Sequence, residues 1–188
     1  MRRALFGVLT VTFALAMAMQ TSTQAPAHTP RGTAVDVTNT EIQAAIQKTI
    51  TAPVSDQQLR VVSINDEYNV GVGILHRAKA GGSSGIEHSQ ITEIYHMMKG
   101  SATLVTGGTL ENPKESAPDS SIVKVLNGPS TTGPRIVGGQ SRKLTVGDVV
   151  VIPPNTAHWF SEFDSDDIIY LVVRVDPHKV LPAGYVLK

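Results

Sequence analysis

The pattern of apolar positions divides the chain into one helical segment followed by many short strands. Between positions 42 and 50, apolar residues recur three or four residues apart, which is the period of an amphipathic helix. Thr38 and Glu41 have the spacing of a capping box at the helix start, and Pro53 ends the pattern. These signals predict a single helix within residues 36–55.

From residue 56 onward, the chain consists of short apolar or alternating runs separated by Gly, Pro and Asn turn signals. The predicted strands cover residues 59–64, 69–77, 93–98, 102–106, 122–126, 143–146, 149–153, 158–163 and 168–175. Closely spaced strands without helices between them are typical of an antiparallel sandwich or barrel. We therefore expect an all-β domain over residues 56–180 with one N-terminal helix packed outside it.

The first eighteen residues have the pattern of a secretion signal. Arg2 and Arg3 precede an uncharged apolar run that ends in an Ala-Met-Ala cleavage pattern at Ala18. A membrane anchor is the alternative, but the run is shorter than the roughly 20 residues of a spanning helix. We expect a cleaved signal over 1–18, a disordered lead over 19–35, no stable membrane anchor, and a secreted or periplasmic protein.

Charge and cysteine content narrow the classes of partner. The 188 residues hold 16 Lys and Arg against 16 Asp and Glu, so no basic face for nucleic acid is implied. The chain has no cysteine and therefore no disulfide. A small-molecule substrate or ligand is the expected partner.

Two separated segments carry residues suited to metal binding. In the first, His88 is followed by Glu93 after four residues and by Gly100 after six more. Strand alternation places Glu93, Tyr95 and Met97 on one face and turns His96 to the other.

The second segment lies about seventy residues later along the chain. Gly147 is followed by five residues, Pro153, Asn155 and then His158. Asn is the best non-glycine residue for a left-handed turn position, so a turn is expected at Asn155.

These two segments resemble the two motifs of the cupin superfamily, over roughly residues 60–176. The first motif, HxH, three or four residues, Glu, six residues, Gly, matches except that Ile86 stands where its first histidine would be. The second motif, Gly, five residues, Pro-x-Gly-x-x-His, matches with Asn155 for its inner glycine. The stretch TEIYHMMKGSATLVTGG is similar to a subgroup of small, single-domain type-2 cupins. The resemblance implies a double-stranded β-helix, a jelly-roll-like barrel, and often a homodimer.

In that fold the barrel interior holds a divalent metal, and the resemblance implies that His88, Glu93 and His158 are its ligands. Two imidazoles and one carboxylate suit Fe(II), and they also accept Mn, Zn, Ni or Cu, with Fe(II) or Mn favoured here. Three protein ligands leave positions open, as in catalytic rather than structural sites. An alternative register pairs His88 with Gln90, but it places Glu93 one residue too early.

The function expected from this set is a metal-dependent enzyme acting on a small polar organic molecule, as a dioxygenase, isomerase, lyase or decarboxylase. Tyr95 shares the face of Glu93 and is the candidate general base, with a buried core tyrosine as the alternative. A non-catalytic barrel that binds a sugar or signal molecule is the rival function, because this fold hosts many functions.

Two further polar residues have more than one interpretation. Arg174 is either an anion clamp for a carboxylate substrate or a partner of Asp176 or Glu162. His76 lies on the apolar face of its predicted strand, which favours a core or rim histidine over a ligand.

Overall fold

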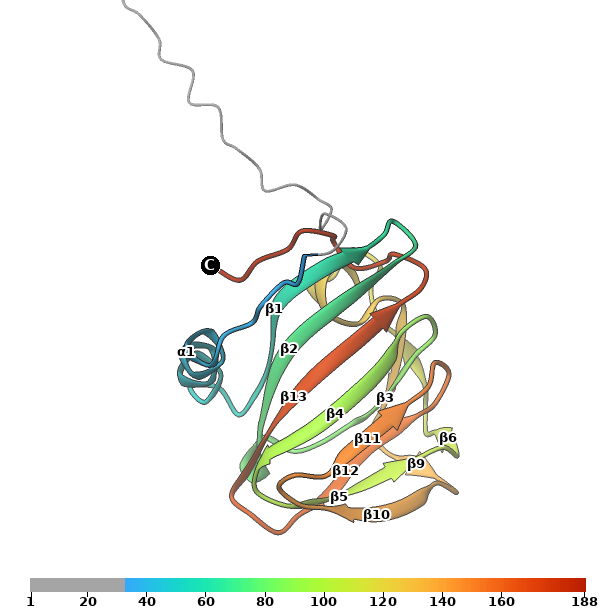
Figure 1. The fold of residues 1–188 in the computed structure, drawn as a ribbon. Helices are drawn as coiled ribbons and strands as arrows, with labels where there is room; N and C mark the ends of the chain where they lie inside the picture. Colours follow the sequence, from blue (N-terminus) through green and yellow to red (C-terminus); the bar gives the residue numbers. More distant parts are fainter. Residues whose placement is uncertain (1–32) are drawn as a thin grey trace, which may run out of the picture.

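The computed structural model describes residues 33–188 (Figure 1). The predicted signal over 1–18 and the part of the predicted lead up to residue 32 lie outside the described residues and stay predictions. Residues 33–38 have no regular secondary structure, and helix α1 (Asn39–Thr49) follows them. Among the described residues, no helix is both long enough and apolar enough to cross a bilayer.

The predicted capping box starts helix α1. The Thr38 side chain accepts a hydrogen bond from the Glu41 backbone N–H at 3.3 Å, and the Glu41 carboxylate accepts one from the Thr38 backbone N–H at 2.8 Å. The helix buries Ala45 against a cluster that includes Leu59 and Ile74 of the adjacent sheet. The helix is shorter than the predicted range, because the first strand already begins at Val54.

The strands of the described chain are more numerous than the apolar runs predicted. Their bounds are β1 (Val54–Ile64), β2 (Tyr68–Ala78), β3 (Gly85–His88), β4 (Thr92–Lys99), β5 (Ala102–Thr106), β6 (Thr109–Leu110), β7 (Lys114–Glu115), β8 (Ser130–Gly133), β9 (Ile136–Val137), β10 (Gln140–Leu144), β11 (Val149–Ile152), β12 (His158–Phe163) and β13 (Asp167–Asp176). Strands β3, β8 and the two-residue strands were not predicted, because runs of two to four residues carry too little alternation to recognise.

Most of the strands form two antiparallel sheets that face each other, and β6 and β9 pair in a separate two-stranded sheet (Figure 1). The first sheet has the order β1-β2-β13-β4-β11, and the second has the order β10-β5-β12-β3-β8-β7. The four-stranded sets β2-β13-β4-β11 and β10-β5-β12-β3 give the double-stranded β-helix, or jelly roll. The predicted all-β fold is confirmed, with α1 packed on the outside of the first sheet.

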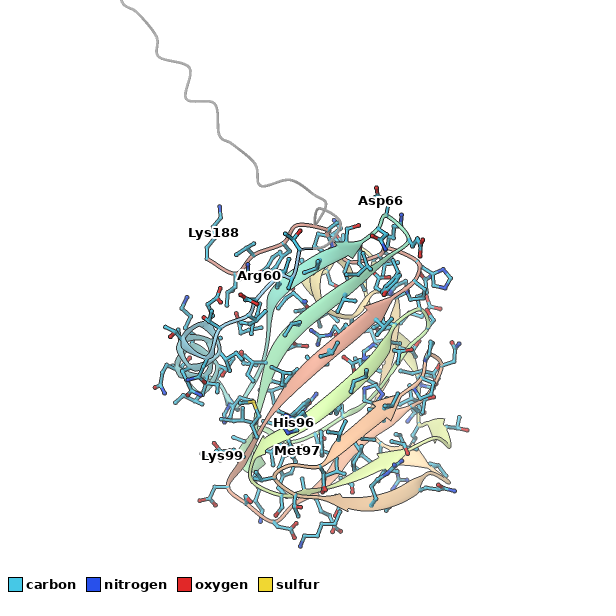
Figure 2. All side chains as sticks on the ribbon, in the orientation of Figure 1. Arg60, Asp66, His96, Met97, Lys99 and Lys188 are labelled. Atoms are coloured by element: carbon cyan, nitrogen blue, oxygen red, sulfur yellow. The ribbon has the colours of Figure 1, made fainter. Side chains whose placement is uncertain are left out.

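Alternation along β4 sorts its side chains between the interior and the outside, as predicted. Met97 is buried in the main core, whereas His96 is exposed on the outer face of the sheet; both are labelled in Figure 2. The core between the two sheets is formed by residues from both of them: Leu75, Tyr95, Met97, Ala102, Leu104, Leu144, Val150, Ile152, Phe160, Ile168, Tyr170 and Val172. This core fills the space next to the polar site described below.

One predicted strand is wrong. Residues 122–126 lie in a short π-helix, η2 (Ile122–Asn127), rather than in a strand. Ser120 explains the difference, because its backbone carbonyl accepts from Lys124 N–H and its hydroxyl from Val123 N–H. Ser and Asp residues just before a short run favour such a helical start over an extended chain.

The edge strand β11 exposes two apolar side chains. Val149 and Val151 point outward, although all the residues of the run 149–153 are apolar. Their pairing partners on β4 are His96 and Ile94. Helix α1 covers only the β1 and β2 side of this sheet (Figure 1). Since the structure is of one chain, the predicted homodimer stays a prediction.

Candidate metal centre

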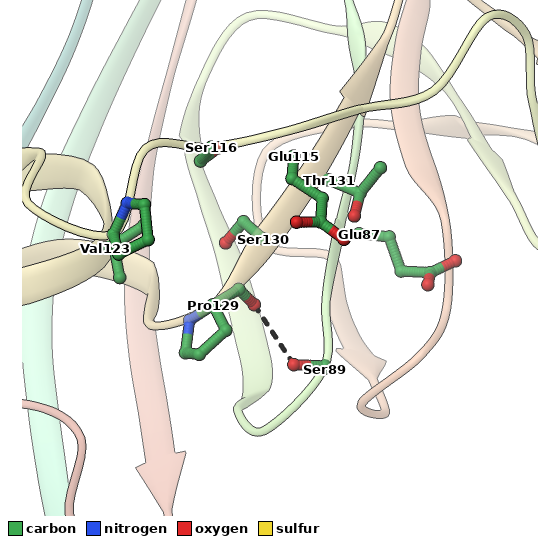
Figure 3. Close-up of a pocket in the computed structure, with 9 residues that line it drawn as sticks. Glu87, Ser89, Glu115, Ser116, Val123, Pro129, Ser130 and Thr131 are labelled. Carbon is green, nitrogen blue, oxygen red and sulfur yellow. Dashed lines mark hydrogen bonds between the residues drawn. The ribbon is translucent and has the colours of Figure 1, made fainter.

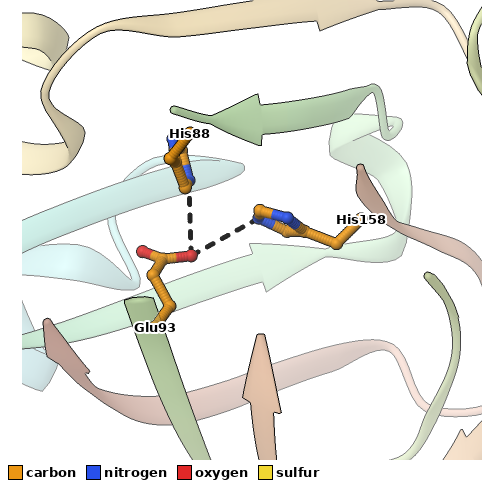
Figure 4. Close-up of side chains that lie close together, drawn as sticks. All are labelled: His88, Glu93 and His158. Atoms are coloured by element: carbon orange, nitrogen blue, oxygen red, sulfur yellow. Dashed lines mark ion pairs between the residues drawn. The ribbon is translucent and has the colours of Figure 1, made fainter. Parts of the chain in front are cut away.

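Three side chains from three strands meet in the barrel interior. His88 ends β3, Glu93 lies in β4 and His158 begins β12. Their potential ligand atoms all lie within 4.8 Å of one another (Figure 4). Glu93 Oε2 is 3.3 Å from His88 Nε2 and 3.4 Å from His158 Nε2. The three side chains are 3%, 2% and 5% exposed, so the group is closed to bulk water.

The two sequence segments are joined directly at this point. Asn155 has the predicted left-handed backbone, with φ at 58°, and its N–H donates to the His88 carbonyl at 2.8 Å. Because the turn that precedes His158 is thereby tied to the end of β3, both histidines are held on neighbouring strands. In the same ladder His158 pairs with Ile86. The spacing between Asn155 and His158 therefore has a structural cause. The turn at Asn155 is bonded to His88, and this bond fixes the His158 imidazole relative to that of His88.

Hydrogen bonds to the far side of each imidazole determine which nitrogen carries the proton. The Ser130 hydroxyl donates to the Gly128 carbonyl at 2.8 Å, so it accepts from His88 Nδ1–H, also at 2.8 Å. A carbonyl can only accept, so His158 Nδ1–H donates to the Thr156 carbonyl at 3.0 Å. Both Nδ1 atoms are committed as donors, which leaves the two Nε2 atoms turned toward Glu93 as ligand atoms.

The electrostatics of the group favour a neutral imidazole beside a carboxylate anion. Burial lowers the pKa of His88 and outweighs the attraction of Glu93. Burial opposes ionisation of Glu93, but His88, His158 and Arg174 together outweigh it and hold the pKa of Glu93 well below its usual range. The His158 Nε2 atom is buried without a hydrogen-bond partner. A divalent cation would satisfy both this atom and the carboxylate, so the residues fit a metal ion.

Tyr95 lies beside Glu93 on the predicted face. Its hydroxyl donates to Glu93 Oε2 at 2.6 Å, and its ring centroid is 4.5 Å from that of Tyr170. Burial, together with the charge of Glu93, raises the pKa of Tyr95 well above its usual range. The protonated phenol is therefore the favoured form beside a free carboxylate, and the role of Tyr95 as a general base stays a prediction.

Arg174 contacts neither of the acidic partners predicted for it. Its guanidinium points into the barrel, where Nε donates to Glu93 Oε1 at 3.1 Å and Nη2 donates to Asp56. Asp176 instead accepts the backbone N–H groups of Val180 and Leu181. The sequence missed this contact because Asp56 lies 118 residues away from Arg174 and carries no motif of its own.

His76 behaves as the sequence predicts, as a buried histidine outside the metal group. Its Nδ1 lies 3.0 Å from the Ala52 carbonyl, and its Nε2 lies 3.3 Å from Asp167 Oδ2. Both ring nitrogens therefore have partners elsewhere in the chain.

Ile86 occupies the place of the missing fourth ligand. It is two residues before His88 on β3, so it lies on the same face, and its ladder partner on β12 is His158. An isoleucine offers no ligand atom, so position 86 contributes none. The alternative register with Gln90 is disfavoured, because Glu93 is the carboxylate that lies between the two imidazoles.

Ile86→His is expected to tighten metal binding. The new imidazole would lie on the interior face next to His158 and add a fourth nitrogen ligand. A gain of about tenfold or more in affinity, worth about 1.4 kcal/mol, is expected from competition with a chelator. Ile86→Phe is the control for size without a ligand atom, and equal affinities in the two variants would contradict the placement of position 86.

A pocket of about 330 Å³ is lined in part by Ser130, the hydrogen-bond partner of His88 (Figure 3). Its walls carry two carboxylates, Glu87 and Glu115, together with hydroxyl groups that include Ser89 and Ser130. Several of these residues come from the Gly-, Pro- and Ser-rich stretch 107–143. Ser130 also bonds His88 Nδ1, so this cavity adjoins the group through one shared side chain.

Three of the solved structures that resemble this chain have the following similarity to it. BH2720 from Bacillus halodurans is 13% identical, with 79% of this chain and 86% of that chain covered and a TM-score of 0.47. The DMSP lyase DddQ from Ruegeria pomeroyi DSS-3 is 15% identical, and the match covers 69% of this chain but only 50% of the lyase, with a TM-score of 0.43. A cupin 2 conserved barrel domain protein from Salinispora arenicola CNS-205 is 19% identical, with 64% and 74% covered and a TM-score of 0.37.

No protein-family model matches the chain, and no curated protein matches it. The likeness to the solved structures is limited to low identities and low TM-scores. The functional evidence therefore lies in the residues of this chain itself.

Proposed function

We propose that this protein binds one divalent metal ion through His88, Glu93 and His158 and is a metal-dependent enzyme for a small polar organic molecule. The observation that carries the proposal is the convergence of two Nε2 atoms on one carboxylate oxygen, at 3.3 and 3.4 Å, inside a closed site. Each imidazole has its Nδ1 proton engaged elsewhere, so the Nε2 atoms are presented as ligands.

The donor set supports a catalytic rather than a structural site. Two imidazoles and one carboxylate favour Fe(II) or Mn, and three protein ligands leave coordination positions open. A bound ion would supply Lewis-acid or redox chemistry at those positions. The chain's own part is to orient the imidazoles through Ser130 and Thr156 and to exclude water by burial.

Tyr95 is the proposed proton-transfer residue. Its hydroxyl is the nearest proton-bearing group on Glu93 Oε2, at 2.6 Å, and it is enclosed by the rings of Phe160 and Tyr170. The raised pKa keeps the proton on the phenol until a cation or substrate changes the charge of the site. It can then release the proton as an acid or take one back as a base.

Tyr95→Phe is expected to lower turnover by about 10² to 10⁴-fold once a substrate is known, because positioned acid–base groups typically contribute that much. Metal content should stay unchanged, since the phenylalanine ring keeps the contacts with Tyr170 and Phe160. Turnover and metal content are measured on the same preparation. Full activity in the variant would return Tyr95 to a packing role.

Metal analysis of the purified protein tests the proposal directly. After expression with Fe, Mn or Zn supplied, we expect about one metal ion per chain, released by a chelator at acidic pH, because the imidazoles must be deprotonated to bind. Fewer than about 0.1 ions per chain for every metal would exclude the centre.

A second candidate function is non-catalytic binding of a small polar ligand. The pocket lined in part by Ser130 supports it, because its carboxylates and hydroxyls offer acceptors and donors without any need for a metal. Ligand binding that survives complete removal of metal would favour this function over the enzyme.

A further inference from the structure

The two oxygens of the Glu93 carboxylate have different surroundings. Oε2 faces His88, His158 and the Tyr95 hydroxyl, whereas Oε1 accepts a hydrogen bond from Arg174 Nε at 3.1 Å. A free carboxylate could offer a metal both oxygens. Here Oε1 already has a charged donor, and Oε2 is the oxygen nearest the imidazoles.

Arg174 is itself held in one orientation by two partners on β1. Nη2 bonds the Asp56 carboxylate, and Nη1 donates to Gln58 Oε1 at 2.8 Å. The Gln58 amide is oriented in turn, because its Nε2 donates to the carbonyls of Arg60 at 2.8 Å and Val72 at 3.3 Å. The guanidinium is 0% exposed. Three separate donors of a rigid planar group are therefore engaged, which leaves it no alternative position.

The neighbouring strand β2 leaves room for this arrangement. Gly71 and Gly73 lie on the inner face opposite Arg174 and Val172. A Cβ at Gly73 would lie 3.0 Å from Arg174 Nη1, and one at Gly71 would lie 2.6 Å from Gln58 Nε2. Side chains at these two positions would displace the guanidinium and its amide partner.

We infer that Arg174 is a positioning residue that holds Glu93 Oε1 away from the two imidazoles, so that Glu93 offers a metal ion a single oxygen. The inference rests on the proposed metal site and defines how that site is built. Asp56 balances the charge of Arg174, and the one-oxygen mode of Glu93 keeps one more coordination position open than a two-oxygen mode would. A lysine at 174 would keep the positive charge but lack the fork that reaches Glu93, Gln58 and Asp56 together.

The test uses Co(II), whose visible absorption reports coordination number and geometry. Co(II)-loaded wild type is compared with Arg174→Lys, Asp56→Asn and the control Arg77→Lys. Arg77 lies on the neighbouring strand β2, and its Nε donates to the Tyr170 hydroxyl rather than to Glu93. We expect Arg174→Lys to change the Co(II) spectrum and weaken Co(II) binding about 10–100-fold, the usual effect of an outer partner of a ligand. Asp56→Asn should weaken binding at least about tenfold, and Arg77→Lys should match wild type.

The possible outcomes distinguish a failure of the proposed metal site from a failure of the positioning role of Arg174. If wild type binds no Co(II), the proposed function itself fails. If wild type binds Co(II) and Arg174→Lys gives the same spectrum and affinity, the positioning role is overturned. If Arg174→Lys does not fold, Asp56→Asn decides, because a neutral amide holds Nη2 less firmly than the carboxylate does and loosens the guanidinium. An unchanged Co(II) spectrum and affinity in that variant would overturn the inference.

Discussion

His158→Ala is expected to abolish metal binding and leave the protein folded. The substitution removes one of three ligands, and metal content should fall from about one ion per chain to below about 0.1. The fold should survive, because Nε2 has no hydrogen-bond partner and Nδ1 bonds only the local Thr156 carbonyl. Metal at about 100 times its dissociation constant should stabilise wild type by about 2.7 kcal/mol and the variant not at all.

The matched control for this prediction is His96→Ala. His96 lies on β4 three residues after Glu93, but it is exposed on the outer face of the sheet (Figure 2). It should keep full metal content and the same stabilisation by metal. If His158→Ala retained its metal while circular dichroism showed a native fold, the ligand set would be wrong.

Arg174→Met should destabilise the metal-free protein by about 3–5 kcal/mol in the free energy of unfolding. The substitution keeps an apolar stem of similar length but leaves the carboxylates of Glu93 and Asp56 without their shared cation. Removing one partner from a buried charge network costs this much because the remaining charge is desolvated and unpaired. Urea unfolding of metal-free wild type and variant measures the difference.

Arg135→Met is the control for loss of an ion pair as such. Arg135 forms a two-point contact with Glu111 at 2.7 and 3.0 Å, but its side chain is 60% exposed. Exposed pairs contribute little, so this variant should unfold close to wild type. A similar loss in the free energy of unfolding in the two variants would show that the buried Arg174 network contributes no more stability than an exposed ion pair.

The identity of the candidate ligands could be predicted from spacing and residue type. Strand alternation alone predicts Glu93 and Tyr95 on an inner face and His96 on an outer one, and the structure agrees. The left-handed turn at Asn155 was equally readable, because few residues other than glycine tolerate it. These signals are local, which is why a single sequence contains them.

The partners of the ligands were beyond the reach of sequence patterns. Arg174 bonds Gln58 and Asp56, which lie 116 and 118 residues earlier in the chain. Only the assembled sheet brings β13 close to β1. Ser130, which fixes the His88 tautomer, lies in a loop-rich region 42 residues from it. Long-range hydrogen bonds leave no periodic trace along a chain, so their residues look like ordinary polar positions.

The paired glycines of β2 have a consequence for how this barrel can change over evolution. Gly71 and Gly73 leave the volume that the Arg174 side chain and its partner Gln58 fill, so positions 71, 73 and 174 form one packing unit. A relative with a small residue at 174 is free to carry alanine or valine at 71 and 73, whereas a relative with arginine there is not. We expect substitutions at these positions to appear together, and any one of them made alone in this chain to be rejected by selection.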